Sequence, residues 1–224
     1  MRFSGIRAVI IDLDGTMLDT APDFHAAINC MRAELALAPL DIETIKNFVG
    51  KGSENLIQRV LSVDFDDEQV ARHFDAGLAA YQRHYLALNG DFATLYPQVR
   101  EGLDAMQQRG LRLACVTNKP IDFTLPLLDK VGLRHYFSVI YGGDSLPTKK
   151  PAPGPFQQVC RDFDIAPQQA VAIGDSSNDA IAARAAGCYV LTVPYGYNHG
   201  APVQAIDSDG IVETLLDAAA HITV

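Results

Sequence analysis

Residues 8–16 read Ala-Val-Ile-Ile-Asp-Leu-Asp-Gly-Thr, an apolar run that ends in two aspartates and a glycine. A continuous apolar run of this length, rich in β-branched residues, is typical of a strand buried on both faces of a parallel sheet. Similar apolar runs recur along the chain at residues 111–116, 138–141, 170–173 and 189–193. These runs predict the strands of one buried sheet.

Segments with helical character alternate with these runs. They lie at residues 99–108, 123–131, 156–163 and 178–186. Strands that alternate with helices predict an α/β fold with a doubly wound parallel sheet, and right-handed crossovers place helices on both of its faces.

The region between Pro22 and Leu88 departs from this alternation. Its apolar residues recur at helical spacing, and no run in it suits a strand. Asp41 and Ser53 are expected to cap helices, and residues 50–52 to form a loop between two of them. We therefore expect a small α-helical cap domain at residues 19–91, inserted into a core domain made of residues 1–18 and 92–224. The hinges should fall near residues 17–21 and 89–96.

The composition excludes several classes of protein. The chain has 224 residues, a formal net charge of −9 and a sequence pI near 5.0, which argues against a surface built for nucleic acid or anionic membrane. The start of the chain leaves no room for a signal peptide, and no apolar stretch has the roughly 18 residues that a membrane span needs. We expect a soluble cytoplasmic protein, monomeric or homodimeric.

The four cysteines are expected to be buried free thiols; they are Cys30, Cys115, Cys160 and Cys188.

Four polar signals fall after predicted strands, and ligands of open α/β sheets bind outside the carboxyl ends of the strands. The first is Asp12-Leu13-Asp14-Gly15-Thr16. Residues two apart on an extended chain point to one side, so both carboxylates should face one cleft. One carboxylate could attack a phosphorus atom while the other acts as general acid and base. Gly15 would allow the backbone to approach phosphate oxygens. A simple surface turn is the alternative.

The second and third signals are weaker when taken alone. Thr117 and Asn118 close the strand at 111–116 and could hold a phosphate through neutral donors, although both residue types also cap helices. Lys150, followed by Pro151, is a placed point charge that suits phosphate, or else a solvated basic turn.

The fourth signal is the segment Gly174-Asp175-Ser176-Ser177-Asn178-Asp179. Asp175 at a strand end is a natural ligand for magnesium, which takes oxygen ligands. Asp179 falls in the first turn of the next predicted helix, where an acid is favourable in any case, so we expect it to serve both the helix and the site.

The negative charges of the aspartates in these signals have a common consequence. Asp12, Asp14, Asp175 and Asp179 would place four negative charges around a dianionic phosphate, and one lysine cannot balance them. A divalent cation would resolve the repulsion and stabilise charge on the transferring group. The motif set therefore predicts a Mg²⁺ cofactor.

In these residues the chain resembles the haloacid dehalogenase superfamily, specifically its phosphatases with a small helical cap. The resemblance rests on Asp12-x-Asp14-Gly15-Thr16, Thr117-Asn118, Lys150-Pro151 and Gly174-Asp175-x-x-Asn178-Asp179, and covers essentially the whole chain. It implies a Rossmann-like core with Asp12 as nucleophile and Asp14 as general acid/base that also lends its backbone carbonyl to Mg²⁺. Thr117 and Lys150 would hold phosphate, Asp175 would ligate the metal, and Asp179 would support Lys150 and the metal.

Within the superfamily, several stretches are similar to those of bacterial phosphoglycolate phosphatases. They are residues 116–120, 142–147, 149–151 and 195–200. The loop at Gly50 and Lys51 sits where such proteins carry a specificity loop, so both are candidate substrate-binding residues; Lys51 would contact a carboxylated substrate or remain solvated. Ala152 departs from the His or Asp of many relatives.

The resemblance implies hydrolysis of 2-phosphoglycolate, with a sugar phosphate or another small phosphorylated metabolite as the alternative substrate. A phosphomutase would use the same two aspartates. A dehalogenase needs neither Asp14 nor a magnesium site, and a non-catalytic relative would be expected to have lost Asp12, Asp14 or Lys150. The six histidines show no metal-binding spacing, and His25 and His199 are expected to be surface or structural residues.

Overall fold

A computed structural model describes residues 2–224. It contains a six-stranded sheet in the order β5-β4-β1-β6-β7-β8, in which every neighbouring pair is parallel. The strands are β1 Ala8–Ile11, β4 Arg112–Val116, β5 Val139–Tyr141, β6 Ala170–Gly174, β7 Tyr189–Thr192 and β8 Gly210–Ile211. The predicted α/β class is confirmed, and the expected strands are present with ends that differ by one residue at most. The short edge strand β8 was not predicted.

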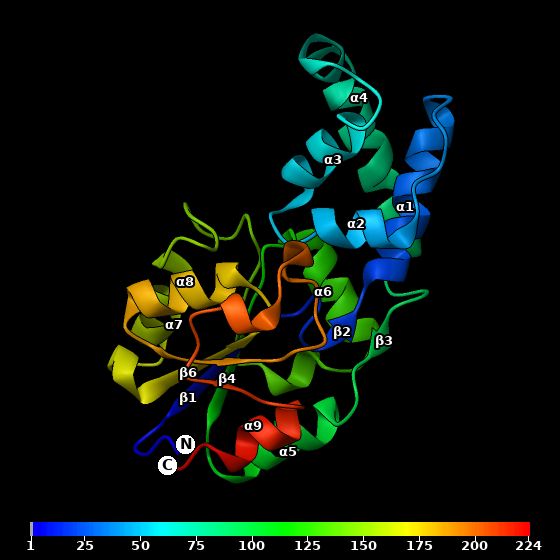
Figure 1. Cartoon of the computed structure of the whole chain (residues 1–224). Coiled ribbons are helices and arrows are strands. Elements are labelled where there is room, and N and C mark those ends of the chain that lie inside the picture. The colour runs from blue at the N-terminus through cyan, green and yellow to red at the C-terminus, as the bar shows by residue number, and fades with distance from the viewer. Residues whose placement is uncertain (1) are drawn as a thin grey trace.

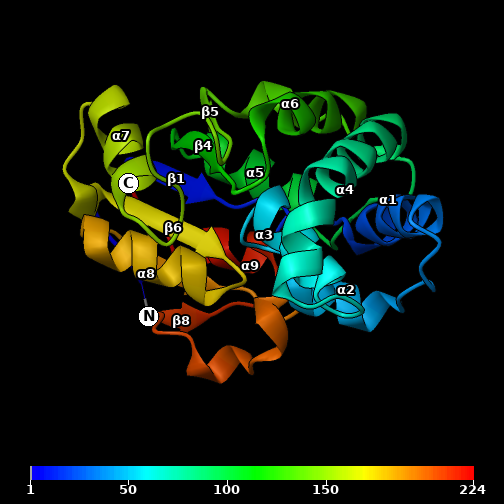
Figure 2. The ribbon, with the colours of Figure 1, turned by 90° about the horizontal axis from the view of Figure 1, so that it is seen from above.

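Helices cover both faces of this sheet (Figure 2). One face carries α5 Val99–Gln108, α6 Ile121–Lys130 and α9 Leu215–Ala220, and the other carries α7 Gly154–Asp162 and α8 Ser177–Ala186. In β1, Val9 and Ile11 pack into the first layer while Ala8 and Ile10 pack into the second. The apolar run is continuous because alternate side chains serve two separate cores.

The register of the central strands sets the position of the site. Ile11, the last residue of β1, is level with Cys115 of β4 and with Ile173 of β6. The polar residues that follow these three strands therefore emerge at the same edge of the sheet.

Four helices that stand above this edge form a separate unit, which we call the helical lobe (Figure 1). They are α1 Ala21–Glu34, α2 Ile42–Phe48, α3 Ser53–Leu61 and α4 Asp67–Leu88. Their apolar residues form their own cluster, centred on side chains such as Ile28, Ile57 and Tyr85. Asp41 caps α2 as expected, since its carboxylate accepts a hydrogen bond from Thr44 N at 2.8 Å. The expectation for Ser53 is wrong by one residue: the N-cap is Gly52, whose φ of 90° suits a residue without a side chain.

The chain crosses between the sheet and the lobe twice, and the two crossings are tied together. Strand β2 (Leu18–Asp19) pairs antiparallel with β3 (Thr94–Leu95), so the two segments support each other. Buried Asp23 adds to this link, because it accepts hydrogen bonds from Gly90 N at 2.7 Å and Phe92 N at 2.8 Å. The sequence did not predict either two-residue strand. We propose that the lobe is the inserted domain of residues 19–91.

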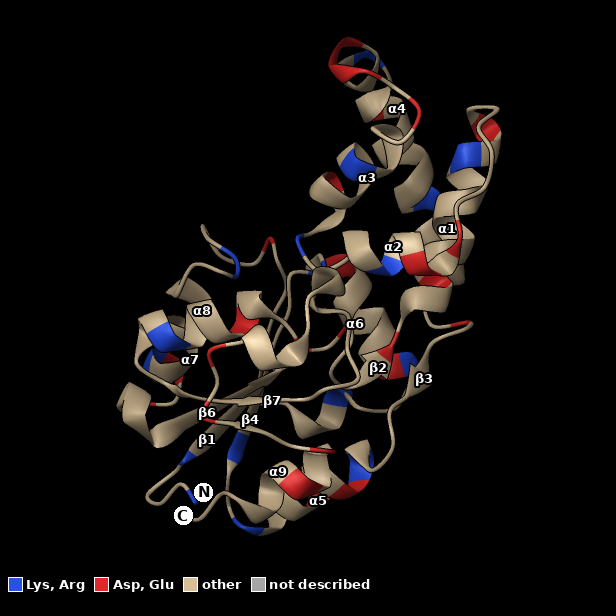
Figure 3. Ribbon diagram, viewed as in Figure 1, with Lys and Arg blue, Asp and Glu red and all other residues tan. Residues whose placement is uncertain are grey.

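Surface features complete the description. Acidic residues gather at the tip of the lobe between α3 and α4, far from the sheet (Figure 3).

Within the described chain all four cysteines are free, but Cys30 is exposed, which corrects the expectation that all are buried. It lies in the last turns of α1 with its side chain open to solvent. None of the helices in residues 2–224 is long and apolar enough to cross a membrane.

The packing of two helices gives a stability prediction with a matched control. A Cβ atom at Gly102 in α5 would lie 2.5 Å from the backbone carbon of Leu215 in α9, whereas one at Gly77 in α4 would meet Leu61 Cδ1 at an ordinary 3.5 Å. Alanine gains about 1 kcal/mol over glycine within a helix, but overpacking costs about 1–3 kcal/mol. Gly102→Ala should therefore lower the free energy of unfolding by up to about 2 kcal/mol, and Gly77→Ala should raise it by up to about 1 kcal/mol. Urea denaturation measures both, and equal effects of the two changes would contradict this packing.

Candidate active site

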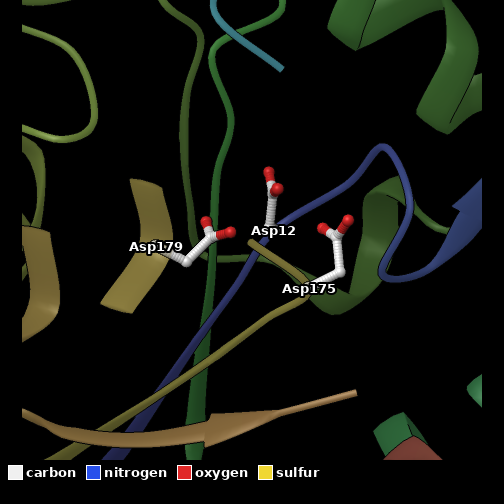
Figure 4. Close-up of side chains that lie close together, drawn as sticks. All are labelled: Asp12, Asp175 and Asp179. Carbon is white, nitrogen blue, oxygen red and sulfur yellow. The ribbon is translucent and has the colours of Figure 1, made fainter. Parts of the chain in front are cut away.

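Three carboxylates meet where β1 and β6 end. Asp12 follows β1, Asp175 follows β6, and Asp179 lies in the first turn of α8. One oxygen atom of each lies within 4.8 Å of the others, and the three side chains point into one space (Figure 4). Asp175 and Asp179 are only 3% and 2% exposed. The sequence spacing thus predicted a true cluster.

Burial strongly affects the ionisation of this cluster. It raises the pKa of Asp12 well above the ordinary value; nearby Lys150 opposes the shift, and Asp179 and Asp175 add to it. Burial, assisted by the charge of Asp179, raises the pKa of Asp175 to about 7. These shifts mean that burial and the neighbouring carboxylates together disfavour the charged forms of Asp12 and Asp175.

The donor set fits a divalent metal ion. Asp12, Asp175 and Asp179 offer hard carboxylate oxygens, and their raised pKa values indicate charge that a cation would stabilise. These three residues could hold a metal ion. The side chain of Asp14 is not part of this set, because its Oδ1 atom accepts hydrogen bonds from Thr20 Oγ1 at 2.7 Å and Lys119 Nζ at 2.9 Å.

Lys150 links the carboxylates. Its Nζ atom lies 2.7 Å from Asp12 Oδ1 and 2.6 Å from Asp179 Oδ1, and it donates to the carbonyl of Val116 at 2.8 Å. Burial alone would lower the pKa of Lys150, but the facing carboxylates outweigh it and the pKa is raised. Lys150 does not directly follow a strand: residues 142–149 bring it back from β5 before α7 begins. That loop could not be placed from the sequence.

Gly15 and Thr16 lie against the side chain of Asp175. Thr16 Oγ1 donates to Asp175 Oδ1 at 3.0 Å. Gly15 has a φ of 83°, and a Cβ atom there would lie 2.5 Å from Asp175 Oδ2. Both residues were expected to bind substrate, but neither lines the cavity of this arrangement. Their contacts hold Asp175, and their part in substrate binding stays a prediction.

Asn118 connects the site to the lobe, and Thr117 lies beside it on the cavity wall. The Asn118 amide donates to the carbonyl of Lys150 at 2.9 Å and to that of Gly50, in the lobe, at 3.0 Å. Its Oδ1 atom is buried and finds no hydrogen-bond partner among residues 2–224. Thr117 Oγ1 accepts a hydrogen bond from the backbone N–H of Lys119 at 3.1 Å. Asn118 thus links the loop at Lys150 to the lobe at Gly50.

The lobe loop meets the site through Gly50. The carbonyl of Gly50 also accepts a hydrogen bond from the Asn178 amide at 3.2 Å. Gly50 has a φ of 108°, and a Cβ atom there would lie 2.8 Å from His199 Cε1. Lys51 is exposed and is not among the residues that line the cavity. The loop is therefore placed as expected, while contact between Lys51 and substrate stays a prediction.

The sheet edge and the lobe enclose a small cavity. It has about 40 Å³ of room for water-sized molecules, and a single water needs about 10–15 Å³ on that measure. The core supplies its polar wall, including Asp12, Asp14 and Lys150. The lobe supplies an apolar wall, including Phe24, Tyr81 and Tyr85. The site is shaped for a small ligand with a charged end.

Lys119, Tyr85, Tyr197 and His199 are among the lining residues that were not predicted as site residues. Tyr197 N donates to Asp175 Oδ2 at 2.7 Å, and its hydroxyl accepts hydrogen bonds from Thr20 N and Ala21 N at 2.8 Å each. His199 faces the Asn178 amide at 3.1 Å, and burial lowers its pKa. The similarity of residues 116–120 and 195–200 to known phosphatases was the available signal for three of these residues.

Comparison with known proteins agrees with this site. Residues 6–187 match the family model of the haloacid dehalogenase-like hydrolases. The chain is 49% identical to a phosphoglycolate phosphatase of Nitrosospira multiformis, over 95% of this chain and 94% of that protein. It is 46% identical to one of Thiobacillus denitrificans, over 97% and 96% respectively.

A solved structure is similar over the same length. A protein of Haemophilus somnus 129PT, described as a predicted phosphoglycolate phosphatase, shares 32% identity and superposes with a TM-score of 0.91, covering 97% of this chain and 98% of that one. The resemblance to this superfamily is confirmed. The chain belongs to the family of haloacid dehalogenase-like hydrolases.

Proposed function

We propose that the protein is a Mg²⁺-dependent phosphatase that hydrolyses 2-phosphoglycolate to glycolate and inorganic phosphate. The observation that carries this proposal is the convergence of Asp12, Asp14 and Lys150 on one small enclosed cavity. Two carboxylates in one cavity, each paired with a lysine, suit nucleophilic attack followed by proton transfer. The curated relatives, which bear the name phosphoglycolate phosphatase, supply the substrate.

In the first step, a carboxylate oxygen of Asp12 attacks the phosphorus atom of the substrate. A bond forms between Asp12 and phosphorus while the bond from phosphorus to the ester oxygen breaks. Asp14 gives a proton to the departing oxygen, so glycolate leaves as the alcohol. Lys150 holds Asp12 in place through the 2.7 Å ion pair. Thr117 and the Asn118 backbone are candidates to hold phosphoryl oxygens.

In the second step, water attacks the phosphorus atom of the aspartyl-phosphate. Asp14 takes the proton of that water, the bond between Asp12 and phosphorus breaks, and inorganic phosphate is released with Asp12 restored. Mg²⁺, when held by Asp12, Asp175 and the backbone of Asp14 with support from Asp179, screens the carboxylates from the phosphoryl group and stabilises the charge that develops on it.

Removal of the nucleophile gives the first test. Asp12→Asn should lower kcat by at least about 10³-fold, because an amide cannot form the covalent intermediate. Phosphate release measures the loss, and circular dichroism checks the fold. Asp129→Asn, an equivalent change on exposed α6, should keep full activity. Substantial turnover by Asp12→Asn would refute the assignment of the nucleophile.

Removal of the metal gives the second test. Excess chelator should abolish phosphate release, and added Mg²⁺ should restore it. Mg²⁺ at about 100 times its Kd should stabilise the protein by about 2.7 kcal/mol, which raises the melting temperature by several degrees. Asp175→Asn should lose most of this rise, whereas Asp129→Asn should retain it. Activity that persists in excess chelator, together with a melting temperature that does not change on addition of Mg²⁺, would contradict a metal site here.

The choice of substrate is tested by steady-state kinetics. We expect kcat/KM for 2-phosphoglycolate to exceed that for sugar phosphates and nucleotides by at least about 10²-fold, because a cavity of this size and polarity favours a short anionic molecule. Release of inorganic phosphate separates hydrolysis from the phosphoryl transfer of a mutase. A sugar phosphate as the best substrate would overturn the proposed substrate and leave the phosphatase chemistry in place.

A further inference from the structure

Lys119 is a buried cation that the proposed chemistry leaves unused. Its side chain is 2% exposed, and its Nζ atom lies 2.9 Å from Asp14 Oδ1. The same atom lies 4.4 Å from the ring centre of Phe24 and 4.7 Å from that of Tyr85, both in the helical lobe. The ammonium group therefore sits between the expected general acid and the apolar wall of the cavity.

The backbone holds Lys119 in a fixed position. Its N–H donates to Thr117 Oγ1 at 3.1 Å, and its carbonyl accepts hydrogen bonds from Gly143 N at 2.9 Å and Thr124 Oγ1 at 3.3 Å. These backbone hydrogen bonds fix the Cα position of Lys119, and the ion pair with Asp14 and the two ring contacts place its ammonium group in the cavity wall. A charge fixed in this way before binding favours affinity for a ligand of one geometry.

A second polar group in the same wall has no partner. The hydroxyl of Tyr85 is buried, and nothing in residues 2–224 forms a hydrogen bond with it. Tyr85 lines the cavity, and its ring stacks between those of Phe24 and Tyr81 at centroid distances of 5.1 and 5.4 Å. A buried hydroxyl without a partner is unfavourable, so a ligand acceptor at this point would stabilise the structure.

Lys119 is also the cation that remains available. Among the described residues that line the cavity, Lys119 and Lys150 are the only lysines or arginines. The Nζ atom of Lys150 is already engaged by Asp12, Asp179 and the Val116 carbonyl. Lys119 has one anionic partner, Asp14, and the proposed reaction requires that residue at the ester oxygen of the substrate.

We propose that Lys119 Nζ and the Tyr85 hydroxyl bind the carboxylate of the substrate while the phosphoryl group lies at Asp12. This assignment rests on the proposed function. In 2-phosphoglycolate the carboxylate carbon is two bonds from the ester oxygen, so a molecule with that oxygen at Asp14 brings its carboxylate next to Lys119. The carboxylate then gives Lys119 a new anionic partner and leaves Asp14 free for proton transfer. A substrate with a hydroxyl at this position cannot balance the lysine charge.

The experiment compares two substrates that differ only in charge. 2-Phosphoglycolate and its neutral amide, phosphoglycolamide, have nearly the same shape. Lys119→Met should lower kcat/KM for phosphoglycolate by about 100-fold while changing that for the amide by less than about 3-fold, since only the carboxylate loses an ionic partner. Tyr85→Phe should lower the values for both substrates by up to about 5-fold, because the carbonyl oxygen of the amide accepts the same hydrogen bond as the carboxylate. Lys46→Met, the same change at a half-buried position of α2 outside the cavity lining, should alter neither value.

The ratio of the two kcat/KM values decides between outcomes. The assignment is supported if the ratio of kcat/KM for phosphoglycolate to that for the amide falls strongly in Lys119→Met. Lys119→Gln provides the same comparison if the methionine variant does not fold. An equal fall for both substrates would mean that Lys119 acts only through Asp14, and would overturn the carboxylate site. If the wild type prefers phosphoglycolate and the Lys119 variants keep that preference, this inference fails and the proposed function stands. If the wild type shows no preference for the carboxylate, the proposed substrate fails as well.

Discussion

Crowded negative charge at the carboxyl edge of the sheet is the constraint on which the rest of this structure depends. Asp12, Asp175 and Asp179 place carboxylate oxygens within 4.8 Å of one another in a buried space. The surrounding contacts all serve to hold this charge: Lys150 pairs with two of the carboxylates, and Tyr197 N and Thr16 Oγ1 donate to the third. Burying charge without such partners is unfavourable. The same excess charge makes the edge a place for a cation and a phosphoryl group.

The helical lobe turns this open edge into an enclosed cavity. The core supplies groups that react or carry charge, and the lobe supplies the aromatic wall of Phe24, Tyr81 and Tyr85. Chemistry and substrate choice are thus placed on different parts of the chain, as in other folds where variable segments surround a constant catalytic edge. Lys119 is the exception, because it belongs to the core yet contacts the lobe.

The sequence predicted what is local and left out what is not. The apolar run at 8–11 fixes β1 because both faces are buried, and Asp12, Asp175 and Asp179 follow strand ends that the pattern marks clearly. Strands β2 and β3 have two residues each, too few for any periodicity to show. Their pairing depends on tertiary contact alone.

Contacts between residues that are far apart in the sequence could not be predicted either. Lys119 and Asp14 are 105 positions apart, and the gap between Gly50 and Asn178 is 128. Tyr85 falls on the apolar stripe of α4, where the spacing indicates packing and gives no sign of an unpartnered hydroxyl. Substrate-contacting groups in such a site become visible only when the lobe and the core are seen together.

The contact between lobe and core at the cavity has a consequence for the effect of salt. Gly50 is held by the uncharged amides of Asn118 and Asn178. Dissolved ions screen exposed charges and leave neutral hydrogen bonds almost unchanged. Ionic strength should therefore act on the approach of an anionic substrate and leave these two hydrogen bonds almost unchanged. Because the chain carries a formal charge of −9, its long-range field repels such a substrate, and added salt should make the encounter faster.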